Sequence, residues 1–266
     1  MRFLLLLVLL ACASASAAAP VVPDYSAEIA LVRPHLTKER LILLGEMHGT
    51  REIPQLVGQL IEDLSAEQPL VLALEVNASE QAAFDHYLAS DGGAQARAQL
   101  EHSPFWSPKS NQHDGRRNHQ ALALIERVRA LRASGRTLSL LAFDPAASTR
   151  DHHERDRVMA TSLRKVIADN PDTRVLVLTG NVHAMRSRPS YAPPQMQTPM
   201  GSYLGDLDPY SINISAREGA SWACQRAICA PIKSAPRQPE SGPQTDGPYD
   251  YQLVLARFTV ADLLGE

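Results

Sequence analysis

The sequence predicts a single α/β domain with a mostly parallel central sheet, helices on both faces of the sheet and late edge strands. Short, almost continuous apolar runs alternate with segments whose apolar residues recur at helical spacing. Strands that are apolar throughout indicate a parallel sheet buried on both faces. A length of 266 residues, 44% of them apolar, suits one sizeable domain better than two small ones.

The predicted elements alternate along the chain. The strands are expected at residues 40–44, 70–74, 137–143 and 174–179, with late strands at 210–215 and 251–258. The helices are expected at residues 24–40, 53–65, 79–89, 118–134 and 150–168. Ser79 is a candidate N-cap, and Gly135 stands where a C-cap glycine belongs. Residues 91–118 read as a long irregular segment, and such segments are usually functional or disordered.

Residues 1–19 have the pattern of an export signal: a basic residue, an apolar core too short to span a bilayer, and a run of small residues. Residues 9–12, which read LLAC, also resemble a bacterial lipobox, and this alternative makes Cys12 a lipidated residue and the only membrane attachment. Both alternatives predict an exported protein, periplasmic or anchored in the outer membrane. The α/β domain is expected to span residues 24–266, with a mobile Pro/Gly-rich insertion at about 234–248.

The net charge and the cysteine count bear on the expected partners and on the expected disulfide. A formal net charge of −3 gives no electrostatic reason to expect nucleic acid. Apart from Cys12, the chain has Cys224 and Cys229, an even pair that could close a short disulfide loop in an oxidising compartment. Two free thiols are the alternative.

Polar residues follow the predicted strands at the ends where parallel strands meet one edge of the sheet. They are Glu46 and His48 after the first strand, Glu75 after the second, Asp144 after the third and His183 after the fourth. The spacing Gly-x-x-His occurs twice, at Gly45 to His48 and at Gly180 to His183. Two imidazoles and two or three carboxylates could bind a divalent metal, or one imidazole could act as a general base for water.

Each of these residues also has a simpler interpretation. Glu46 or Thr50 could cap the following helix, and a polar residue at a strand end is commonplace. Asp144 is the weakest candidate, because an Asp-Pro step is also a frequent start of a turn. The shared edge of the sheet favours the functional interpretation for the set.

The motifs resemble one broad superfamily. Residues 45–52, GEMHGTRE, are similar to the GExxHGTxE signature of erythromycin esterase-like proteins with one residue fewer, and Glu75 falls where that family has its second carboxylate. Residues 155–160, RDRVMA, are similar to that family's RDxxMA helix. Residues 180–186, GNVHAMR, resemble the GNxHxxR motif of the ChaN haem-binding uptake lipoproteins. Paired Gly-x-x-His motifs are found in Tiki metalloproteases and TraB-type proteins, and the resemblance covers about residues 38–205.

The resemblance implies three chemistries: a metal-dependent peptidase, an ester hydrolase with a histidine base, or a haem-binding protein. We expect first a hydrolase of small molecules or peptides centred on Glu46, His48, Glu75 and His183, which are also the candidate metal ligands. The candidates for substrate contact are Asp114, Arg116 and Asn181. The alternative is a haem-binding uptake lipoprotein without turnover. The haem ligand of ChaN-type proteins includes a tyrosine, and Tyr191 and Tyr203 lie near the second motif in the sequence.

Overall fold

The computed structural model describes residues 23–107, 113–145, 152–225, 228–234 and 240–265. The predicted export signal, the lipobox at Cys12 and residues 235–239 of the predicted insertion lie outside the described residues, as do parts of two predicted loops. No helix in the described part of the chain is both long enough and apolar enough to cross a membrane.

The elements follow the predicted alternation. The strands are β1 (Leu41–Glu46), β2 (Leu70–Asn77), β3 (Leu138–Asp144), β4 (Arg174–Gly180), β5 (Tyr210–Gln225), β6 (Ile228–Lys233), β7 (Gly242–Pro243) and β8 (Tyr251–Phe258). The helices are α1 (Ser26–Leu36), α2 (Glu52–Leu64), α3 (Gln81–Leu88), α4 (Ala94–Glu101), α5 (His119–Ala133), α6 (His152–Asp169), α7 (Asn181–Ala184) and α8 (Met200–Tyr203). Two 3₁₀ turns, η1 (Ala78–Glu80) and η2 (Gly205–Leu207), complete them.

One sheet organises the described part of the molecule, with the strand order β3-β2-β4-β1-β5-β8-β7 and with β6 paired to β5 off this path. The first six strands of this order run parallel, and only β6 and β7 are antiparallel to their neighbours. The predicted single α/β domain with a mostly parallel sheet and late strands is confirmed. β8 lies towards the edge, next to the two-residue strand β7.

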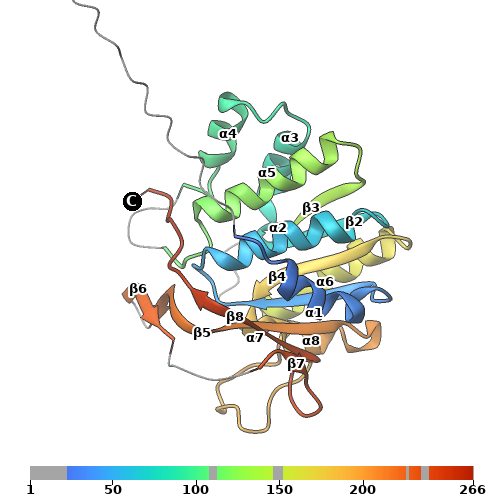
Figure 1. The fold of residues 1–266 in the computed structure, drawn as a ribbon, viewed down its shortest axis with the longest axis vertical. Coiled ribbons are helices and arrows are strands. Elements are labelled where there is room, and N and C mark those ends of the chain that lie inside the picture. The colour runs from blue at the N-terminus through green and yellow to red at the C-terminus, as the bar shows by residue number, and fades with distance from the viewer. Residues whose placement is uncertain (1–22, 108–112, 146–151, 226–227, 235–239, 266) are drawn as a thin grey trace, which may run out of the picture.

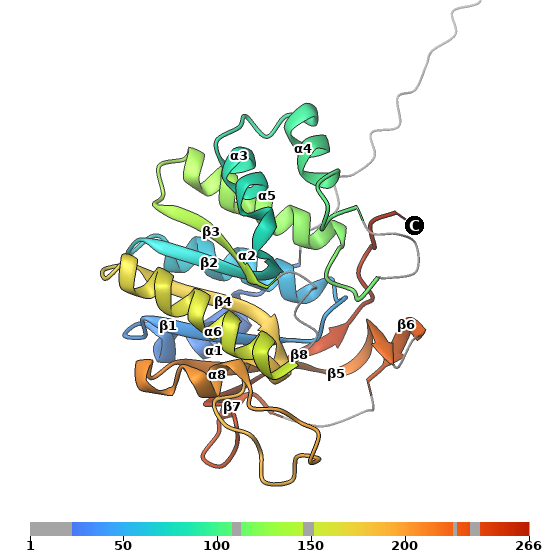
Figure 2. The ribbon, with the colours of Figure 1, turned by 180° about the vertical axis from the view of Figure 1, so that it is seen from behind.

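Two apolar layers cover the sheet. Along β1, Ile42 and Leu44 face the layer that includes α1, α2, α3 and α5, while Leu41 and Leu43 face the layer with α6, α7 and α8. Figure 1 shows α1, α2 and α5 on one side of the sheet, and Figure 2 shows α6 and α8 on the other. Successive side chains of a strand point to opposite faces, so burial on both faces explains the continuous apolar runs.

The structure differs from the sequence expectations in three places. Residues 91–118 contain the helix α4, whose apolar residues are too few to give a clear helical stripe. Ser79 is not an N-cap, because it lies within η1 and α3 begins after it, with Glu80 in the cap position and no side-chain capping bond. β5 runs ten residues beyond its predicted end at Ser215 and forms a hairpin with β6, which was not predicted.

Candidate functional site

The carboxyl ends of four neighbouring strands bring the predicted residues together. In the order β3-β2-β4-β1, Asp144 ends β3, Glu75 lies near the end of β2, Gly180 ends β4 and Glu46 ends β1. His183 follows β4 on the short helix α7. Gly180 lies at the centre: a Cβ added there would be 3.1 Å from His48 Nε2, 3.4 Å from His183 Cδ2 and 3.5 Å from Glu75 Oε2. The two Gly-x-x-His motifs therefore meet, as the sequence predicts.

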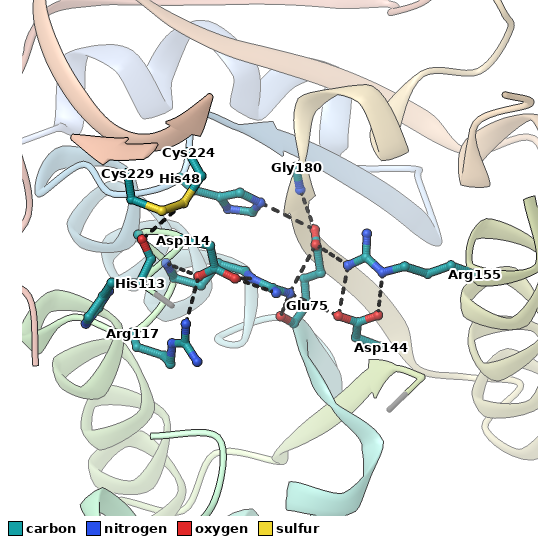
Figure 3. A network of polar contacts seen from close by, with 12 residues as sticks. His48, Glu75, His113, Asp114, Arg117, Asp144, Arg155, Gly180, Cys224 and Cys229 are labelled. Carbon is teal, nitrogen blue, oxygen red and sulfur yellow. Dashed lines mark hydrogen bonds and ion pairs between the residues drawn. A yellow bond between two sulfur atoms is a disulfide. The ribbon is translucent and has the colours of Figure 1, made fainter. Parts of the chain in front are cut away.

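Glu75 is the buried anion of this site, with its side chain only 4% exposed. Its Oε2 accepts hydrogen bonds from Thr179 Oγ1 and from the backbone N–H of Gly180, both at 2.7 Å. Its Oε1 accepts from Arg155 Nη2 at 2.6 Å (Figure 3). The same oxygen accepts from Arg116 Nη1 at 3.2 Å. Burial opposes ionisation, but two imidazoles and two guanidiniums outweigh it and hold the pKa of Glu75 well below its usual range.

Asp144 completes this ion cluster with the same two arginines. Arg155 donates from Nε to Oδ1 and from Nη2 to Oδ2 of Asp144, both at 2.8 Å, and Arg116 Nη1 donates to Oδ2 at 3.0 Å. Arg116 also binds Asp114 through Nε and Nη2 at 3.0 and 2.7 Å. Burial is again the largest single effect and raises the pKa of Asp114, but Arg116, His48 and Arg117 together outweigh it and lower this pKa to about 2.

His48 is held at one ring nitrogen and open at the other. Its Nδ1 lies 3.0 Å from Glu46 Oε1, while its Nε2 lies 3.8 Å from Glu75 Oε2, beyond hydrogen-bond distance. An imidazole that donates from Nδ1 to a carboxylate keeps a lone pair on Nε2. Burial lowers the pKa of His48, but Glu75 and Glu46 outweigh this effect, and the pKa is raised from its usual value of 6.5.

His183 is held at both ring nitrogens. Nδ1 lies 2.7 Å from Asp156 Oδ1, and Nε2 lies 2.8 Å from Arg155 Nη1. Because an arginine can only donate, Nε2 accepts this bond and Nδ1 donates to Asp156. Asp156 is itself fixed, since its Oδ1 also accepts from the backbone N–H of Met200 at 2.7 Å. His183 is therefore an oriented imidazole whose free lone pair is already used by Arg155.

An open cleft of about 310 Å³ gives access to His48 and His183. Its walls come from the β1–α2 loop, the start of α7, Asp114 and the β5–β6 hairpin, and the lining residues include Glu46, His48, Asn181, His183 and Cys224. Asp114 and Asn181, two of the predicted substrate contacts, therefore lie on the cleft. Arg116, the third, is held by Glu75, Asp144 and Asp114, and its side chain is 19% exposed.

The predicted metal ligands do not form a ready metal site in this arrangement. Both oxygens of Glu75 accept hydrogen bonds from N–H and O–H donors, and Nε2 of His183 is bound to Arg155. In the described part of the chain, no group of three or more His, Cys, Asp and Glu residues is arranged to hold a metal ion. A metal bound by Glu46, His48, Glu75 and His183 would have to displace these donors.

Sequence reasoning missed three residues that hold the site. Arg155 and Asp156 lie on α6, upstream of the fourth strand, and Thr179 precedes Gly180 at the end of β4. The resemblance of residues 155–160 to a family motif was the signal that could have placed Arg155 and Asp156. Of the two tyrosines considered for haem, Tyr191 is 83% exposed and Tyr203 packs against the apolar layer on the α6 side.

Comparisons with known proteins support the fold. No model of a protein family matches the chain, and no curated protein matches it by sequence. A mutant of erythromycin esterase EreC in its open conformation has a TM-score of 0.60 at 14% identity, with 79% of each chain covered. A succinoglycan biosynthesis protein has a TM-score of 0.57 at 10% identity, with 91% of this chain and 93% of that chain covered.

A third solved structure, a protein from Bacillus cereus, has a TM-score of 0.55 at 10% identity and covers 92% of this chain and 94% of its own. At these identities the likenesses show a shared fold. The chain thus has the fold of the erythromycin esterase structure. A shared fold does not determine chemistry, which depends on the residues of the site.

Proposed function

We propose that the protein is a hydrolase in which His48 acts as the general base for a water molecule. The observation that carries this proposal is the arrangement of His48, whose Nδ1 is bound to Glu46 at 3.0 Å and whose Nε2 is left to accept a proton beside the cleft. A carboxylate at Nδ1 orients an imidazole and stabilises the imidazolium that forms during catalysis. The shared fold with an erythromycin esterase supports an ester as the substrate class.

The reaction follows from these contacts. His48 Nε2 takes a proton from a water molecule while the water oxygen adds to the carbonyl carbon of the ester. The tetrahedral intermediate then loses its alcohol, and His48 returns the proton to the departing oxygen.

Glu75 has a positioning role in this proposal. A general base needs a pKa near the working pH and a free lone pair, and Glu75 has neither, because its pKa is held low and each of its oxygens accepts two hydrogen bonds. It instead fixes Arg116, Arg155 and the backbone of Gly180 around His48.

The test is hydrolysis of a panel of esters, lactones and peptides by the wild-type protein and the variants His48→Gln and Glu46→Gln. Loss of a general base lowers kcat by about 10²–10⁴-fold. His86→Ala is the matched control, because His86 is an exposed histidine on α3 that contacts Gln99. Because the pKa of His48 is raised, activity should fall as pH drops through a value above 6.5. Unchanged hydrolysis in both site variants contradicts the proposal.

Metal dependence and haem binding are the two alternatives that a single preparation tests. Metal analysis of the purified protein, together with an optical spectrum before and after haem addition, distinguishes a bound metal, bound haem and a site with neither. A stoichiometric metal removed by a chelator together with activity supports the metal-dependent form. A Soret shift at one haem per chain supports the haem-binding alternative.

Export is part of the proposal. Mass spectrometry of the mature protein distinguishes cleavage among the small residues at 13–19 from lipidation of Cys12. An N-terminus at Met1 in the mature protein contradicts both forms of export signal.

A further inference from the structure

The hairpin formed by β5 and β6 borders the cleft, and it carries Cys224 and Cys229, which lie beside His48 and His113 (Figure 3). Its strands pair from Ala220 with Lys233 to Gln225 with Ile228. Cys224 and Cys229 face each other across the hairpin and form a disulfide, which confirms the predicted pairing. Ala223 and Cys224 line the cleft together with His48 and Asp114, so the hairpin is one wall of the site.

Trp222, two residues before the disulfide, contacts the loop that carries His48. Its backbone N–H donates to Gly49 O at 3.0 Å. Gly49 has a φ of +69°, and a Cβ added to it would lie 2.5 Å from Trp222 O. Only a glycine allows both this backbone conformation and this close approach. The residue next to His48 is therefore fixed against the hairpin.

Trp222 also contacts the segment that carries Asp114. Its indole Nε1 donates to His113 O at 2.7 Å, and Cys224 Sγ lies 3.3 Å from the same oxygen. Gly115 has a φ of +89°, and a Cβ added there would lie 2.6 Å from Trp222 O and 3.0 Å from the Cα of Gly49. Two segments that are far apart in the sequence thus meet at one tryptophan.

We propose that Trp222 is a positioning residue for His48 and Asp114, and that the Cys224–Cys229 disulfide holds it in place by closing the hairpin. Trp222 does not line the cleft, but both loops that it contacts do. Its contacts fix the backbone on one side of His48 and on both sides of Asp114. The inference concerns geometry, and only its effect on turnover rests on the proposed hydrolase function.

The test uses Trp222→Phe, which removes the indole donor, and the double variant Cys224→Ser with Cys229→Ser, which opens the hairpin but keeps Trp222. In the double cysteine variant, hydrogen exchange measured by mass spectrometry should become about fivefold faster in residues 47–51 and 113–118, as expected from the loss of one hydrogen bond. Trp222→Phe keeps the backbone bond to Gly49 and loses the indole bond to His113, so it should have this effect in residues 113–118 only. Peptides from β2 and β4 should keep their protection. Ile228→Ser is the matched control, because Ile228 lies on the same hairpin with its side chain 74% exposed.

The indole resonances give a second readout. The chain has two tryptophans, Trp106 and Trp222, so a nitrogen–proton correlation spectrum shows two indole N–H signals, assigned by Trp222→Phe. In the double cysteine variant the Trp222 signal should shift, while the buried Trp106 signal reports that the core is folded. If exchange in both loops and the Trp222 signal are unchanged in the double variant, and Trp222→Phe leaves residues 113–118 protected, the inference is overturned.

Turnover separates this inference from the proposed function. If the panel shows hydrolysis that depends on His48, the double cysteine variant should lower kcat more than it changes KM, because the loop of the base is loosened while the cleft remains. Absence of hydrolysis in the wild type contradicts the proposed function alone, since the exchange and resonance measurements use no substrate.

Discussion

At the scale of single residues, Glu75 determines how the charges of the site are arranged. It is the shared acceptor of two guanidiniums that also share Asp144, so removal of its charge leaves Arg155 with Asp144 as its one carboxylate partner and Arg116 with Asp144 and Asp114. Breaking a buried ion pair by removing one partner costs about 3–5 kcal/mol, whereas exposed pairs contribute about 0–1 kcal/mol. The stability of the protein should therefore be sensitive to removal of the charge of Glu75, even when the volume of the side chain barely changes.

Glu75→Gln should lower the free energy of unfolding at pH 7 by about 3–5 kcal/mol, measured by urea denaturation. The control Glu62→Gln breaks the ion pair with Arg127, in which both side chains are 45% exposed, and should cost about 1 kcal/mol or less. A loss for Glu75→Gln no larger than that of the control would show that the cluster contributes little to stability.

The same residue predicts a pH dependence. The pKa of Glu75 is lowered from 4.5 in the folded state, so its contribution is present above pH 4.5 and is lost as the pH falls towards the folded pKa. Wild-type stability should therefore decline below pH 4.5 more steeply than that of Glu75→Gln. Asp114, with its pKa lowered from 3.8 to about 2, adds a further decline at lower pH in both proteins.

The residues of the site were predictable to the extent that they follow strands. Glu46, Glu75 and Asp144 lie at the ends of apolar runs, so their convergence follows from parallel pairing. Asp156 and Arg155 lie on a helix among other charged residues, where the local pattern gives no reason to separate a site residue from a solvated one. The hydrogen bond from Arg155 to His183 is a tertiary contact, and no local sequence pattern predicts it.

At the scale of elements, α5 links the helix layer to the site through its N-terminus. Asn118 is the N-cap, and its Oδ1 accepts from the backbone N–H of Ala121 at 2.7 Å. Its Nδ2 donates to Gly115 O at 2.8 Å, so the same side chain starts the helix and fixes the loop of Asp114. The sequence predicted a helix beginning near this residue, but not the second bond.

Asn118→Ala should lower the free energy of unfolding by about 1–2 kcal/mol, as for other lost N-caps. Asn118→Asp is the matched control, because an aspartate keeps the acceptor for Ala121 and loses only the donor to Gly115. We expect the control to recover part of the loss in thermal or urea unfolding. Equal losses in the two variants would show that the bond to Gly115, and not the cap, accounts for the effect.

The hairpin of β5 and β6 shows why other elements were not predictable. The first residues of β5, Tyr210 to Ser215, alternate between apolar and polar side chains within the sheet, and this part of the strand was predicted. Beyond them the strand contains Arg217, Glu218 and Gly219, which break the apolar pattern, although Glu218 and Gly219 still pair with β8 and the residues from Ala220 pair with β6. A Cβ at Gly219 would lie 1.9 Å from Phe258 O, a constraint visible only once β5 and β8 are adjacent.

At the scale of the whole molecule, the segment after β8 is hydrogen-bonded to both loops of the site, the loop of His48 and the loop of Asp114. Ala261 N–H donates to Gly49 O at 2.9 Å, and Leu264 N–H donates to Arg117 O at 3.1 Å. His113 Nε2 lies 2.9 Å from Leu264 O. Gly49 O thus accepts from Trp222 on β5 and from Ala261 in the segment after β8, so two late parts of the chain hold the loop of His48.

Ala261→Pro removes one of these donors and should lower the free energy of unfolding by about 1–3 kcal/mol. Exchange in residues 47–51 should increase as well, measured by mass spectrometry. Ala261→Gly keeps the N–H and is the control, expected to preserve protection of that loop. If the proline variant protects the loop as well as the glycine variant does, the segment has no part in holding it.

This late segment has a consequence for the order of folding. Arg51 binds Val260 O across 209 positions of the chain, so the β1–α2 loop gains its last partners only after nearly all of the described chain has been synthesised. Contacts of such long range require closure of a large loop and form slowly. We expect the sheet β3-β2-β4-β1 to form first and the loop of His48 to acquire its final shape in a later kinetic phase.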